Sequence, residues 1–72
     1  MTGIHPGAVL FDRTYDMPGT VRAVDGAFVV LERPTGLTWR VHYRHLRPAT
    51  PWQHRQLLAL AHLHAQRLRG AL

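Results

Sequence analysis

The sequence contains no cysteine, lysine, serine or asparagine, and its single isoleucine is Ile4. Without cysteine the chain forms neither a disulfide scaffold nor a thiolate metal site, and the composition fits the reducing cytoplasm. No apolar run approaches the roughly 18 residues that cross a bilayer, so we expect no membrane span. No basic segment precedes an apolar one at the N-terminus, so we also expect no signal peptide. With 72 residues the chain has room for one domain at most.

Acidic residues are scarce as well, since four carboxylates face nine basic residues, all arginine, and the formal net charge is +5. Arginine suits phosphate because its planar fork binds bidentately. A GC-rich genome would also favour arginine over lysine, although that bias would not by itself suppress Asp and Glu. The arginine content is therefore explained by function or by codon usage, and the net charge favours an acidic partner such as nucleic acid or an acidic protein surface.

The scarcity of acids and nucleophiles also argues against catalysis. The four carboxylates, Asp12, Asp16, Asp25 and Glu32, are scattered along the chain, and the Asp25 side chain is expected to be used in a turn. There is no serine or cysteine nucleophile and no glycine-rich phosphate loop. So short a chain also leaves little room for a concave pocket. We expect a protein that is not an enzyme and that uses no cofactor and no small-molecule substrate.

Six histidines raise the question of a metal site. His42 and His45 span a strand and the turn after it, where alternation is expected to send their side chains in unrelated directions. His62 and His64 are about 200° apart around a helix, and His54 lies about 12 Å along it from His62. Zinc requires three or four converging ligands. The spacing therefore predicts no metal site.

Hydrophobic residues recur with a period of two from residue 7 to about residue 48, which is typical of strands. The segments with this pattern, separated by turn residues, are 8–13, 20–24, 27–33, 37–43 and 46–48. Asp25-Gly26 is the strongest hairpin signal, and residues 44–46 fit a single helical turn. Short strands joined by tight turns favour a meander closed into a small barrel, because closure removes exposed sheet edges. We predict a tail over residues 1–6 and a five-stranded barrel over residues 7–49.

Alternation also assigns the two faces of these strands. The residues expected in the core are Leu37, Trp39, Val41 and Tyr43 from the fourth strand, with Val21, Val29 and Leu31 from the second and third. The opposite face and the turn after it carry basic side chains. The candidate contacts to nucleic acid or to an acidic partner are Arg22, Arg40, His42, Arg44 and Arg47.

The last part of the chain, residues 50–72, changes to a helical period. Thr50, Pro51 and Gln53 fit a capping box with proline at the first helical position. We predict a helix from residue 51 to about residue 69, ended by Gly70. One apolar stripe combines Leu57, Leu58, Ala61, Ala65 and Leu68, and the opposite side carries Trp52, Ala59 and Leu63.

Twenty helical residues span about 30 Å, whereas a short strand spans only about 17–20 Å. The helix is therefore expected to overhang its barrel, so that Leu63, Leu68 and Leu72 require cover. A homodimer or a hetero-complex would provide it. The candidate protein interface comprises Trp52, Ala59, Leu63 and Leu68.

The glycines and alternating hydrophobics of residues 7–48 resemble the small SH3-like barrels of the KOW and Tudor type, including barrels of small actinobacterial proteins. The matching residues are Gly7, Val9, Gly19, Thr20, Val21, Val24, Asp25, Gly26, Val29, Leu31, Gly36, Trp39, Val41, Leu46, Arg47 and Pro48. The resemblance implies a barrel in which Gly19 is the KOW glycine. It also implies a binding role, since such barrels bind RNA, DNA, RNA polymerase, ribosomal proteins, peptides or methylated side chains.

Two functions follow from these observations. In the first, the chain is an accessory or regulatory protein of the transcription or nucleic-acid machinery, and the basic face binds nucleic acid or an acidic protein surface. In the second, it is a protein–protein interaction module, a homodimer or an adaptor, that uses the C-terminal helix and does not contact nucleic acid.

Overall fold

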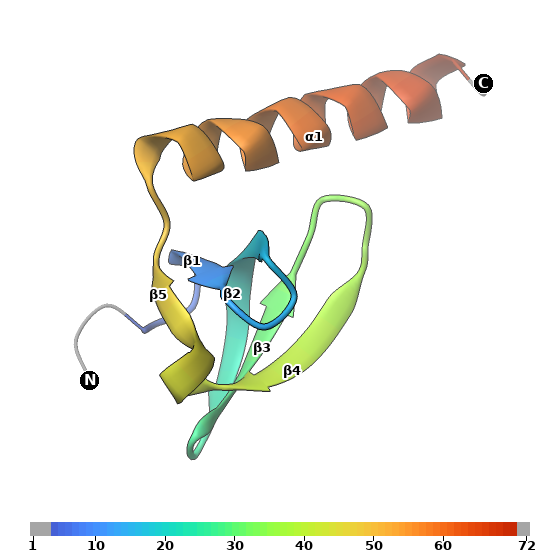
Figure 1. Ribbon diagram of the computed structural model, residues 1–72. Coiled ribbons are helices and arrows are strands. Elements are labelled where there is room, and N and C mark those ends of the chain that lie inside the picture. The colour runs from blue at the N-terminus through green and yellow to red at the C-terminus, as the bar shows by residue number, and fades with distance from the viewer. Residues whose placement is uncertain (1–3, 71–72) are drawn as a thin grey trace.

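The computed structural model describes residues 4–70, which form a five-stranded antiparallel sheet followed by one helix (Figure 1). The elements are β1 (Val9–Asp12), β2 (Met17–Asp25), β3 (Phe28–Glu32), β4 (Thr38–His42), the 3₁₀ turn η1 (Tyr43–His45), β5 (Leu46–Pro48) and α1 (Pro51–Gly70). The strand order is β4-β3-β2-β1-β5, which confirms the predicted sheet with a C-terminal helix. Within residues 4–70 no ladder pairs β4 with β5, so closure into a barrel is not shown.

The second strand is longer than the sequence pattern predicts. Strand β2 begins at Met17, three residues before the expected start, and Phe11 of β1 pairs with Pro18. Proline has no N–H to donate to a ladder, so it is tolerated where a strand has a free edge. Pairing of β2 with β3 starts only at Thr20, so the side of Pro18 that faces away from β1 has no partner in the ladder.

The core lies between the inward faces of the curled strands. Its buried residues are Leu10, Val21, Val29, Leu31 and Val41. The predicted burial of Val21, Val29, Leu31 and Val41 is confirmed, and Trp39 is half-buried against the cluster. The predicted burial of Leu37 and Tyr43 is wrong, because β4 is shorter than expected and both residues lie in the turns that flank it, where they are exposed.

The Trp39 side chain reaches from β4 across the inside of the sheet. Its indole N–H donates a hydrogen bond of 2.8 Å to the carboxylate of Asp12, which is fully buried at the end of β1. The ring passes so close to Gly19 of β2 that a Cβ atom there would lie 2.7 Å from it. Glycine at position 19 is therefore required by this close approach of the indole.

The helix begins at the predicted capping box. The Gln53 N–H donates to Thr50 Oγ1 at 3.2 Å, and the Thr50 N–H donates to Gln53 Oε1 at 2.9 Å. These bonds satisfy two backbone donors that a helix start would otherwise leave unpaired. They also hold Gln53 against the sheet, where it is buried together with Leu57.

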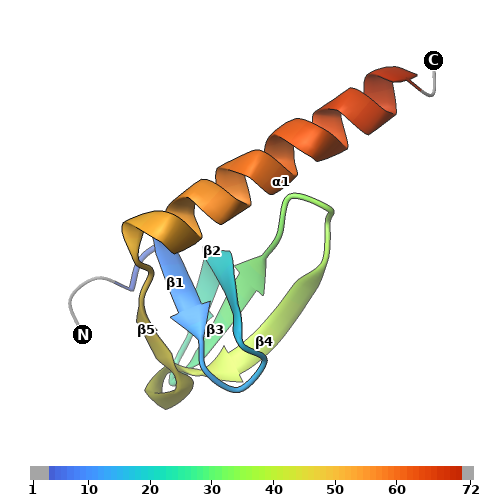
Figure 2. The same cartoon turned by 45° about the horizontal axis from the view of Figure 1, so that its top comes forward.

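The rest of the helix packs on a different stripe from the one predicted. Only Leu57 of that stripe is buried, and the contact face consists of Gln53, Leu57, Leu60 and His64, the last two half-buried. The first turn fixes this orientation, because Gln53 is bound to Thr50 and points toward the sheet. Beyond this contact the helix continues past the β3–β4 turn and leaves the sheet behind, as both views show (Figures 1 and 2).

Candidate nucleic-acid interface

The structure separates the five predicted basic residues into three places. Arg40 and His42 lie in β4, and Arg44 follows in η1, so these three are neighbours. Arg22 lies in β2, on the far side of β3 from β4. Arg47 lies in β5, at the opposite end of the strand order. The predicted single patch is therefore a short group on β4 and η1 with one outlying arginine on each side.

Arg47 is engaged in contacts within the chain. Its guanidinium lies 4.3 Å from the centre of the Phe11 ring, which pairs with it across β1 and β5. The same group donates to Gln53 Oε1 at 3.4 Å and to the Pro48 carbonyl at 3.3 Å. Arg47 thus links β5 to the first turn of α1, and its half-buried side chain helps to fix where the helix starts.

Two acidic side chains lie among the basic residues of the outer face. Arg22 is the extra residue of an irregularity between Val21 and Ala23, and its side chain points to Glu32 at 3.8 Å. Arg40 lies 3.5 Å from Asp25. The Arg22, Arg40 and Asp25 side chains are largely exposed and that of Glu32 is 43% exposed, and ion pairs at such exposure are worth about 0–1 kcal/mol each. Phosphate groups can therefore compete for both arginines at little energetic cost.

Aromatic rings are interleaved with these charges. The Arg40 guanidinium lies 4.4 Å from the centre of the Phe28 ring, and Phe28 meets His42 edge-on at a ring separation of 5.4 Å. His42 is followed by Tyr43 at 4.7 Å. Phe28 and Tyr43 are each 39% exposed, so their rings offer area to a ligand. We call Phe28, Arg40, His42, Tyr43 and Arg44 the aromatic–basic surface.

The sequence indicated part of this surface. Its basic members Arg40, His42 and Arg44 were among the predicted contacts, whereas Tyr43 was assigned to the core and Phe28 was not among the candidate contacts. The signal that would have found the group is register, because Phe28 pairs directly with His42 across β3 and β4. Cross-strand partners lie close enough for their rings to touch.

The two histidines at the end of β4 lie closer together than expected. The rings of His42 and His45 are 6.4 Å apart, so the expectation of unrelated directions is wrong. The reason is the 3₁₀ turn, which folds the chain back at Tyr43. The Arg44 N–H donates to His42 Nδ1 at 3.1 Å, which fixes that nitrogen as an acceptor. Among residues 4–70 no group of three or more His, Asp or Glu side chains is arranged to hold a metal ion.

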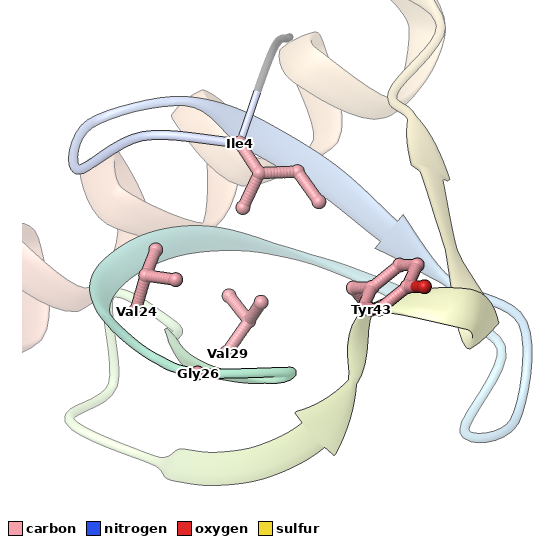
Figure 3. A pocket seen from close by; sticks show the side chains of 5 residues that line it. All are labelled: Ile4, Val24, Gly26, Val29 and Tyr43. Atoms are coloured by element: carbon pink, nitrogen blue, oxygen red, sulfur yellow. The ribbon is translucent and has the colours of Figure 1, made fainter. Parts of the chain in front are cut away.

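A cavity of about 350 Å³ opens beside the β2–β3 hairpin, larger than the sequence suggested. Its walls include Ile4, Val24, Gly26, Val29 and Tyr43 (Figure 3). The Tyr43 hydroxyl points away from the aliphatic side chains. Apart from the Tyr43 hydroxyl, these five residues carry no titratable side chain, so their wall offers mainly shape and apolar contact.

The predicted protein interface on α1 is exposed throughout. Trp52, Leu63 and Leu68 are 62%, 50% and 58% exposed, and Ala59 is exposed as well. Leu68 is about 140° around the helix from Leu63, so one partner cannot cover all four residues from one side. Leu72, also expected to require cover, lies outside the described residues.

Comparison of the chain with protein families, with curated proteins and with solved structures finds no match. Within residues 4–70 no helix has both the length and the apolar character needed to cross a membrane. The features that bear on function are therefore the geometry of the aromatic–basic surface and of the helix.

Proposed function

We propose that this protein binds single-stranded nucleic acid through the aromatic–basic surface, as a non-enzymatic accessory or regulatory protein of the transcription or nucleic-acid machinery. The observation that carries the proposal is the contiguous group on β3, β4 and η1, in which Arg40 lies over the Phe28 ring, Phe28 meets His42 edge-on and Tyr43 follows His42. Exposed aromatic rings bind unpaired bases by stacking, and arginine adds cation–π and phosphate contacts.

The local charge favours single strands over duplex. Arg22, Arg40 and Arg44 lie on or beside the surface, but Glu32 and Asp25 pair with the first two. The net positive charge there is therefore small, and phosphate attraction alone would bind weakly. Stacking has to supply the remaining affinity, and only unpaired bases expose their faces for it.

The resemblance to SH3-like barrels of the KOW type supports the same reading, since members of that group bind RNA or DNA. In a KOW-like barrel, every second side chain of β2, β3 and β4 would point away from the core and form an outer face. The residues proposed to meet nucleic acid lie on that outer face and in the turn that follows it.

Fluorescence anisotropy with labelled oligonucleotides of mixed sequence tests this proposal. At about 50 mM salt, where phosphate contacts are strongest, we expect single-stranded DNA or RNA to bind more tightly than the matching duplex. Absence of binding to any of these probes at that salt concentration contradicts the proposal.

Two matched variants separate this function from the alternative of an interaction module that uses α1. Phe28→Ala should lower the affinity for single strands, whereas Trp52→Ala, at an exposed aromatic residue of the helix, should not change it. The interaction module predicts the opposite result: Trp52→Ala or Leu63→Ala abolishes association with a protein partner, and Arg40→Ala hardly matters.

A further inference from the structure

Four apolar residues of α1 form an exposed seam along one side of the helix. They are Leu58, Ala61, Ala65 and Leu68, whose spacing of three, four and three residues is that of the a and d positions in two successive heptads. All four are exposed, and Leu58 is 70% exposed. We call them the heptad seam. In a coiled coil such a seam packs against another helix, and its small alanines allow the two backbones to approach closely.

No described part of the chain covers this seam. The buried residues of α1 are Gln53 and Leu57, and the helix touches the sheet mainly at β2. The C-terminal end of the helix extends past the β3–β4 turn in both views (Figures 1 and 2). An isolated helix is only marginally stable in water, and most helical stability comes from packing of an apolar face. The C-terminal part of α1, which has little cover from the sheet, therefore gains stability if a partner packs on the seam.

The charges beside the seam indicate which partner fits. The flanking heptad positions carry Arg55, His62 and Arg69 on the side away from the sheet, and Leu57 and His64 on the side that packs toward it; residues 51–70 contain no aspartate or glutamate at all. A second copy of this chain would place arginine opposite arginine or histidine along the seam. Charges at flanking positions decide partner choice in helix pairs. The surface is thus complementary to carboxylates and unfavourable for self-association.

We propose that the heptad seam is a docking site for an acidic amphipathic α-helix of another protein. That helix presents leucine or isoleucine to Leu58, Ala61, Ala65 and Leu68, and its glutamates or aspartates face Arg55 and Arg69. The site is separate from the aromatic–basic surface, which lies on β3, β4 and η1.

Designed helical peptides test the charge complementarity. One probe is a peptide of about four heptads with leucine and isoleucine at the core positions and glutamate at the flanking positions. The second is identical except that lysine replaces glutamate. Anisotropy with the full chain at low salt should show binding of the glutamate peptide, at least about tenfold tighter than that of the lysine peptide. Equal binding of both peptides, or binding of neither, overturns the proposal.

Matched variants of the full chain locate the contact. Ala65→Glu on the seam should weaken binding of the glutamate peptide by about tenfold or more, whereas Ala59→Glu on another side of the helix should change it less than about threefold. Two substitutions that add no charge repeat the comparison: Leu58→Ala on the seam should weaken binding of the glutamate peptide, and Leu63→Ala on another side of the helix should leave it unchanged. Circular dichroism verifies that each variant keeps its helix.

Sedimentation velocity distinguishes a second copy from a different partner. The proposal predicts that the chain alone stays monomeric at concentrations at which it binds the glutamate peptide. A dimer that Ala65→Glu dissociates and Ala59→Glu does not would assign the seam to self-association and would overturn the proposal.

Discussion

The indole N–H of Trp39 in β4 donates a hydrogen bond of 2.8 Å to the carboxylate of Asp12 in β1, although β3 and β2 lie between these strands in the sheet. The other carboxylate oxygen accepts from the backbone N–H groups of Thr14 and Tyr15, at 2.7 and 3.3 Å. One buried carboxylate thus binds the turn after β1 and the inner face of β4 together. The contact holds the sheet in its curled form, which positions the outer face of β3 and β4.

Asp12→Asn should destabilise the fold by about 1–3 kcal/mol. An amide has one acceptor oxygen, so its NH₂ group must face either the indole N–H or the two backbone N–H groups, and a buried donor is left without an acceptor. Chemical denaturation followed by circular dichroism measures the change. Asp16→Asn is the control, because Asp16 is exposed at a φ of 55°, which asparagine tolerates. Equal stability of Asp12→Asn and the parent chain would show that the contact does not hold the sheet.

Gly19→Ala should cost about 1–3 kcal/mol, since the added methyl group would overlap the Trp39 ring and force it to move. The displacement can be followed by Trp39 fluorescence in a Trp52→Phe background, where Trp39 is the sole tryptophan. Gly70→Ala meets open space and should leave both stability and the Trp39 emission unchanged. An unchanged emission maximum in Gly19→Ala would mean that the indole does not rest on residue 19.

Much of this fold could be predicted from local pattern. The period-two alternation located all five strands, and the capping box at Thr50 and Gln53 located the helix start. Element ends were less predictable: β2 extends through Pro18 because one edge of that segment is unpaired, and Leu37 lies in a turn. The Asp12–Trp39 contact could not be predicted, because it joins residues that are distant in sequence and not paired in the sheet.

The candidate site was only partly predictable for the same reason. Alternation indicated that Arg22 and Arg40 point outward, and both are exposed. It could not show that Glu32 and Asp25 would lie beside them, or that the rings of Phe28, His42 and Tyr43 would meet, because both depend on cross-strand register. The helix orientation depends on the buried Gln53, and a polar residue gives no hydrophobic signal.

Loss of the helix cap should loosen α1 without unfolding the sheet. Thr50→Ala removes the acceptor for the Gln53 N–H and should cost about 1 kcal/mol. Hydrogen exchange of the first helical turn should accelerate, while β2 and β3 amides keep their protection. Thr35→Ala, at an exposed turn residue, serves as the matched control. Uniform loss of protection across both sheet and helix would contradict the limited role assigned to the cap.

Removal of a carboxylate beside the aromatic–basic surface should strengthen nucleic-acid binding. Asp25→Asn leaves Arg40 without its ion-pair partner and should raise the affinity for single strands by about two- to fivefold at low salt. Stability should change by less than about 0.5 kcal/mol, because the pair is exposed. Asp16→Asn is the control, because it makes the same change in net charge in the turn between β1 and β2. An equal gain from both variants would show that overall charge, and not the site at Arg40, sets the affinity.

The salt dependence of single-strand binding, compared across the parent chain, Phe28→Ala and Arg44→Ala, tests the central claim most directly. Each phosphate contact contributes about 0.7 to the slope of log affinity against log salt concentration, and stacking of a base on an aromatic residue is worth about 1–3 kcal/mol. We predict that Phe28→Ala lowers the affinity by about fivefold or more with an unchanged slope, whereas Arg44→Ala reduces the slope by about 0.7. Arg55→Ala, on the helix, is the control and should alter neither. If Phe28→Ala binds like the parent chain, or if Arg55→Ala and Arg44→Ala change the slope equally, the aromatic–basic surface is not where nucleic acid binds.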